Sequence, residues 1–157
     1  MITNEKTIRV LNDLIQTNHD RIAGYQKAIE ESGDLDLDIK SIFSRMIQES
    51  QQNNIELANE VAALGGEPVS GVSIGGKIYR LWMNIKTSFS SSERQAILDS
   101  CEYGEDMALE AYEDALQTNA DMTVAQLNLI TKQKAGIQLA HNQVRSYRDA
   151  HADVRVR

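Results

Sequence analysis

The sequence has few of the residues that would interrupt long helices or cross-link the chain. Among its 157 residues there is one proline, Pro68, and one cysteine, Cys101. Proline breaks or kinks a helix, and β-forming residues are sparse outside amphipathic patterns, so an all-α fold is expected. A single cysteine cannot form an internal disulfide, which indicates a reducing, cytoplasmic location.

Long apolar runs and an excess of positive charge are absent as well. No apolar run approaches the roughly 18 residues that a membrane-spanning helix needs, so no membrane partner is expected. The formal net charge of −7 disfavours binding to nucleic acid, which is itself a polyanion. The first residues lack a basic segment followed by an apolar one, so no secretory signal is expected. These features predict a soluble cytoplasmic protein.

The sequence does contain apolar residues at helical spacing. Its composition, 41% hydrophobic and 25% charged, is typical of a globular protein, and its length is typical of a single domain, residues 1–157. Apolar residues recur in steps of three and four, which predicts four amphipathic helices. The expected helices span about residues 4–31, 38–64, 92–117 and 122–150, with a crossover at 65–91.

The connection at residues 65–91 is unusually long. Such a length is uncommon unless the segment carries the chain from one end of a bundle to the other. An amphipathic piece around Ile78, Trp82 and Ile85 predicts a short extra helix, which either packs on the bundle or pairs with another subunit. The order of elements predicts two antiparallel helix hairpins joined by this crossover.

The two halves of the chain repeat each other at an offset of 87 residues. The repeat includes polar residues within the apolar stripes and a tyrosine seven residues after the first of them. The matched pairs are Asn18 and Glu105, Tyr25 and Tyr112, Gln51 and Gln138, and Asn54 and His141. Because equivalent positions converge about a pseudo-two-fold axis, we expect these side chains to face a common interior.

This spacing resembles that of the ferritin-like di-iron carboxylate proteins, over about residues 3–150. In that family two helices each supply a Glu, and the other two each supply a Glu-x-x-His pair. The run from Arg80 to Lys86, the run from Cys101 to Glu105, and Tyr112 also resemble a bacterial family of short ferritin-like four-helix-bundle proteins of unassigned function. The resemblance implies a ferritin-like four-helix bundle.

The resemblance also implies six metal-site positions, of which only Glu105 and His141 keep a metal-binding residue type. The other four positions carry the amides Asn18, Gln51, Asn54 and Gln138. Amides are poor ligands for transition metals, and they cannot neutralise or bridge two ions as carboxylates do. We therefore expect a degenerate site without a di-iron cofactor. A single labile metal ion is the most it would hold, with Glu102, one turn away, as a further candidate ligand.

Two interpretations stay open for the polar residues that remain. Glu105 and His141 form either a mononuclear metal or acid–base site, or a buried ion pair left behind when the metal was lost. The amides either recognise a small ligand or fix the helix register. Tyr25 and Tyr112 are expected to support this layer through their hydroxyl groups, and Cys101 to pack as a small hydrophobe.

The predicted function is non-catalytic, namely a structural, stress-associated or partner-binding role. The stress association comes from the resemblance alone. The protein is expected to form a homo-oligomer, with a dimer as the expected state. The alternative is a mononuclear metal-binding or redox protein that uses Glu105 and His141.

Overall fold

The computed structural model describes residues 2–32, 37–71, 93–118 and 120–156, and all of its regular structure is α-helical. The four helices are α1 (Ile2–Ser32), α2 (Leu37–Ala63), α4 (Glu93–Gln117) and α5 (Val124–Val156). The all-α prediction is confirmed. The short extra helix predicted around Trp82 lies outside the described residues.

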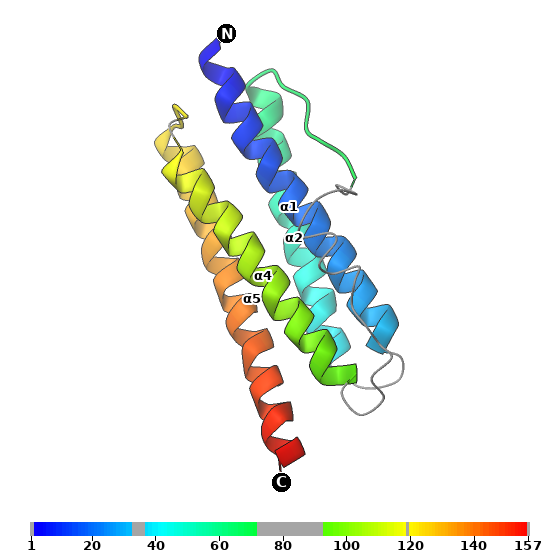
Figure 1. Ribbon diagram of the computed structural model, residues 1–157. Helices are drawn as coiled ribbons and strands as arrows, with labels where there is room; N and C mark the ends of the chain where they lie inside the picture. The colour runs from blue at the N-terminus through cyan, green and yellow to red at the C-terminus, as the bar shows by residue number, and fades with distance from the viewer. Residues whose placement is uncertain (1, 33–36, 72–92, 119, 157) are drawn as a thin grey trace.

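The helices pair as two antiparallel hairpins, α1 with α2 and α4 with α5, as predicted (Figure 1). Helix α1 also packs along α4, whereas α2 and α5 make few contacts with each other. Helices α2 and α4 run in the same direction, as predicted for two hairpins joined by a long connection (Figure 1). Three of the four seams between neighbouring helices are therefore closely packed, and the α2–α5 seam is open.

Local sequence explains where two of these helices begin and end. After α2, Gly65 has a φ of 85°, and the amides of Gly65 and Gly66 donate to the carbonyls of Ala62 and Val61. This is a Schellman motif, in which glycine adopts the left-handed conformation at no steric cost. Before α5, Thr123 and Gln126 exchange side-chain to backbone hydrogen bonds as a capping box.

The last helix is longer than predicted. We expected α5 to end near Ala150, because the residues from His151 onward are basic and polar, but the helix continues to Val156. No glycine or proline follows Ala150, so nothing in the local sequence stops the helix. Among the described helices, none combines the length and hydropathy that a membrane span requires.

The core consists of two apolar clusters separated by a polar layer at mid-height. One cluster contains Tyr25, Phe43 and Cys101, so the cysteine is packed in the core as expected. The other contains Leu11 and Tyr112, together with apolar residues from all four helices. The buried polar residues between these clusters are Asn18, Arg21, Ser50, Asn53, Glu105 and Gln133.

Candidate functional site

The centre of the polar layer is Arg21, a residue that sequence reasoning did not select. Its side chain is fully buried, and its guanidinium contacts two other helices. Nε and Nη2 donate to the two carboxylate oxygens of Glu105 on α4, at 2.6 and 2.8 Å. Nη1 donates to Ser50 Oγ at 2.8 Å and to Glu49 Oε1 at 3.2 Å, both on α2. The bidentate geometry is the strongest pairing that a guanidinium and a carboxylate can make.

Burial and neighbouring charges both shift the pKa values of ionisable groups in this layer. Burial alone would lower the pKa of Arg21, but Glu105, with smaller contributions from Tyr25 and Glu49, more than offsets this and raises the pKa above its ordinary value. Burial and the nearby Glu105 charge raise the pKa of Tyr25, whose ring lies 5.9 Å from the guanidinium carbon. Burial also raises the pKa of the Glu49 carboxyl, and Arg21 offsets part of that increase. The arginine is thus held as a permanent cation in the middle of the bundle.

A chain of amides continues the layer from Arg21 towards the second apolar cluster. Asn18 donates to the hydroxyl of Tyr112 at 2.8 Å and accepts from Asn53 at 3.2 Å. The Tyr112 hydroxyl donates to Gln133 Oε1 at 2.7 Å. Gln133 in turn donates to the backbone carbonyl of Asn53 and to Glu56 Oε1. These bonds link all four helices at one level, which fixes their relative heights.

Two of the predicted site residues, Gln51 and Gln138, do not face the interior. Both are exposed, and Asn54 is half-buried with its amide beside His19 Nδ1 at 3.4 Å. On α2 the interior positions are instead Ser50 and Asn53. The predicted positions were each one residue away from a buried position. One residue along a helix rotates the side chain by about 100°, which is enough to turn it out of the interior. Asn18 and Glu105 are both fully buried and so face the common interior, as predicted.

The predicted pairing of Glu105 with His141 is also wrong. Glu105 is bound by Arg21, whereas His141 Nε2 lies 2.6 Å from Asp106 Oδ1 and 4.0 Å from Glu102 Oε1. The buried arginine supplies the positive charge that the carboxylate requires, so no imidazole is needed there. His141 therefore belongs to a second polar cluster, between α4 and α5.

This second cluster combines two carboxylates with one imidazole. Glu102 and Asp106 are four residues apart on α4 and so lie on one helix face. Ligand atoms of Glu102, Asp106 and His141 all lie within 4.8 Å of one another. On α5, Arg148 pairs with Glu102 Oε2, and Arg145 Nε lies 3.8 Å from Glu102 Oε1. Of these residues, sequence reasoning had selected Glu102 and His141 but not Asp106.

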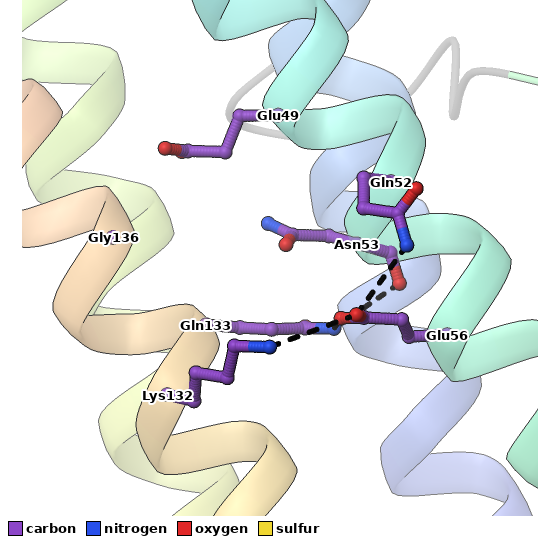
Figure 2. Close-up of a pocket in the computed structure, with 7 residues that line it drawn as sticks. All are labelled: Glu49, Gln52, Asn53, Glu56, Lys132, Gln133 and Gly136. Carbon is purple, nitrogen blue, oxygen red and sulfur yellow. Dashed lines mark hydrogen bonds and ion pairs between the residues drawn. The ribbon is translucent and has the colours of Figure 1, made fainter.

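The open α2–α5 seam holds two adjoining clefts that share Glu49 and Gly136, with volumes of about 230 and 280 Å³. Figure 2 shows the Glu49 side chain reaching from α2 towards the helix that carries Gly136. A Cβ atom at Gly136 would lie 3.4 Å from Glu49 Oε2, so the glycine keeps the space beside this carboxylate open. Lys132 and Gln133 approach Glu56 across the same cleft (Figure 2).

The clefts have contrasting linings. The smaller one is bordered mainly by polar and charged side chains, Gln52 and Glu56 among them. The larger one is lined in part by Ile42, Met46 and Leu139, and Leu139 is 70% exposed. The seam therefore presents a polar half and a partly apolar half.

A comparison with protein families identifies a match over residues 6–118 to the family described as a domain of unknown function, DUF2383. Because the match covers most of the chain, the protein belongs to this family. A search of curated proteins finds no match to the chain.

Proposed function

We propose that this protein is a non-catalytic, ferritin-like bundle with a structural, stress-associated or partner-binding role in the cytoplasm. The observation that carries this proposal is the fully buried guanidinium of Arg21, bound by Glu105 at the level of the predicted metal site. The ferritin-like relationship is supported by the two hairpins, by the shared direction of α2 and α4, and by a polar layer inside the bundle. The stress association rests on the resemblance alone.

The buried arginine opposes metal binding in the interior by simple electrostatics. At an effective dielectric constant of about 20, an ion of charge +2 placed about 4 Å from a guanidinium is repelled by about 8 kcal/mol. The fully buried carboxylate of this layer, Glu105, is already neutralised by Arg21 through two charge-assisted hydrogen bonds. The side-chain amides of Asn18, Asn53 and Gln133 are hydrogen-bonded to one another, to Tyr112, to Glu56 and to the backbone, and they bring no negative charge.

We expect no di-iron centre and no ferroxidase activity. After incubation with ferrous iron in air, elemental analysis should find fewer than two irons per chain. Absorbance of the ferric product should rise no faster than in protein-free buffer. Two irons per chain together with catalysed oxidation would contradict the proposal, whereas one exchangeable ion per chain would not.

We further propose that the protein self-associates as a homodimer through the partly apolar half of the α2–α5 seam. Leu139 stands exposed there, above the buried side chains of Ile42 and Met46, and a second copy would cover Leu139. Covering exposed apolar area is the main driving force for such an association.

The dimer is tested by sedimentation of the wild type and two variants. Leu139→Glu should shift the protein from dimer to monomer, because it places a charge in the covered surface. The control, Val124→Glu, changes an apolar residue that is 74% exposed at the start of α5 and should remain dimeric. A wild type that is monomeric at all concentrations, or a dimeric Leu139→Glu variant, would rule out this interface.

A further inference from the structure

We propose that Glu102, Asp106 and His141 form a mononuclear site for a divalent transition-metal ion that takes mixed nitrogen and oxygen ligands. The site is separate from the interior layer around Arg21 and does not depend on the function proposed above. One imidazole and two carboxylates are a ligand set that suits borderline ions, of which Zn²⁺ is the simplest probe. All three ligand atoms already lie within 4.8 Å of one another.

The orientation of His141 is the first observation that points to a cation. The side chain is only 8% exposed, and its Nδ1 lies 3.5 Å from Asn142 Oδ1. The same amide oxygen accepts a hydrogen bond from Gln138 Nε2 at 3.0 Å, which fixes it as the acceptor facing the imidazole. An imidazole that donates from Nδ1 to this oxygen directs the lone pair of Nε2 towards the carboxylates.

The surroundings of Nε2 are the second observation. This buried nitrogen makes no hydrogen bond within the described structure, although Asp106 Oδ1 lies 2.6 Å away and Glu102 Oε1 lies 4.0 Å away. Three potential ligand atoms thus lie within 4.8 Å of one another, and the closest two, on His141 and Asp106, are at ion-pair distance. Such an arrangement is unfavourable unless a cation lies between the donors. Either a second proton on the imidazole or a metal ion can fill this role, and the experiment below separates the two.

The carboxylates are placed for metal binding in different ways. The Glu102 side chain is 11% exposed, Arg148 pairs with its Oε2, and its Oε1 lies 4.0 Å from His141 Nε2 and 3.8 Å from Arg145 Nε. An arginine that fixes the second oxygen of a ligating carboxylate is a common outer-shell arrangement. Asp106 is 56% exposed, so its side chain can adjust from 2.6 Å to the roughly 3.3 Å that separates two ligands of a tetrahedral Zn²⁺ ion. Its exposure also leaves water access to a fourth coordination position.

The experiment measures Zn²⁺ binding to the full-length protein. We expect one Zn²⁺ per chain after gel filtration in metal-free buffer, with affinity measured by competition with a chromophoric chelator. Asp106→Asn and His141→Gln should each weaken binding at least about 10-fold, since outer-shell changes alone cost that much. The exposed Asp106 can be changed without disturbing the core, so its variant tests the site even if His141→Gln unfolds. In the wild type, the NMR signals of the His141 imidazole should shift on addition of Zn²⁺.

Two matched variants separate this site from non-specific binding. His19→Gln removes another imidazole, and Asp114→Asn removes another exposed carboxylate of α4. Both should bind Zn²⁺ as the wild type does. The proposal is overturned if the wild type retains no Zn²⁺, which would assign the cluster to a proton alone. It is equally overturned if Asp106→Asn binds as tightly as wild type, or if His19→Gln loses the ion.

Discussion

Replacing Arg21 with methionine is expected to lower the free energy of unfolding by about 3–5 kcal/mol, because the Glu105 carboxylate is then left buried without a partner. Both side chains are fully inaccessible to solvent, so water cannot replace the guanidinium. Urea titration at neutral pH measures the loss. An unchanged dependence on urea concentration would show that the folded state keeps its compactness.

Comparing Arg21→Met, Glu105→Leu and the double variant shows whether the two residues stabilise the protein as a coupled ion pair or independently. Apolar side chains of similar size often replace a buried pair at little cost, so the double variant should be more stable than Arg21→Met alone. Lys27→Met is a control that removes a half-buried surface pairing with Glu31 and should leave the urea midpoint nearly unchanged. If the single losses simply add in the double variant, Arg21 and Glu105 do not form the coupled pair described here.

The helices and their pairing could be predicted from the sequence because they depend on features that span many residues. Steps of three and four in the apolar residues define a helix over seven or more turns, so a single misplaced residue does not remove the signal. The glycines at 65 and 66 mark the end of α2 by their effect on backbone conformation alone. The long sequence between α2 and α4 predicted that these two helices run in the same direction.

The interior polar residues could not be placed with the same certainty. Between Ser50 and Asn54 all five residues of α2 are polar, so hydrophobicity does not distinguish which of them face inward. The repeat suggested Gln51 and Asn54, whereas the packing of Met46 and Leu57 places Ser50 and Asn53 inside. The apolar stripe of an amphipathic helix is about 100° wide, and each residue along the helix is rotated by about the same angle. The stripe therefore locates the inward-facing positions only to within one residue.

Arg21 was missed for a related reason. An arginine is normally exposed, and Glu105, the buried carboxylate that Arg21 binds, had been paired with His141 in the prediction. Its spacing did carry a signal, since it lies three residues after Asn18 and four before Tyr25 on the same helix face. Because Glu105 is an interior carboxylate, this spacing indicates that Arg21 is the cation of α1 that faces Glu105 and can neutralise it.

The second large effect is expected at Tyr112, where replacement by alanine should cost about 3–5 kcal/mol, as for other large core aromatics. The side chain is fully buried and packs among apolar residues of the second cluster. Tyr112→Phe keeps this packing but removes the hydroxyl that joins Asn18 to Gln133. It should cost about 1–3 kcal/mol, the usual penalty for leaving buried polar groups unsatisfied.

The neighbouring residue provides the control for Tyr112. Glu113 is 56% exposed and makes only a surface ion pair with Lys134, so Glu113→Ala should change stability by no more than about 0.5 kcal/mol. All three variants are compared by urea titration under the same conditions. Equal losses at the two positions would mean that the inner face of α4 is rotated. If Tyr112→Phe is as stable as wild type while Tyr112→Ala is not, the tyrosine contributes packing alone, and the amide chain does not depend on its hydroxyl.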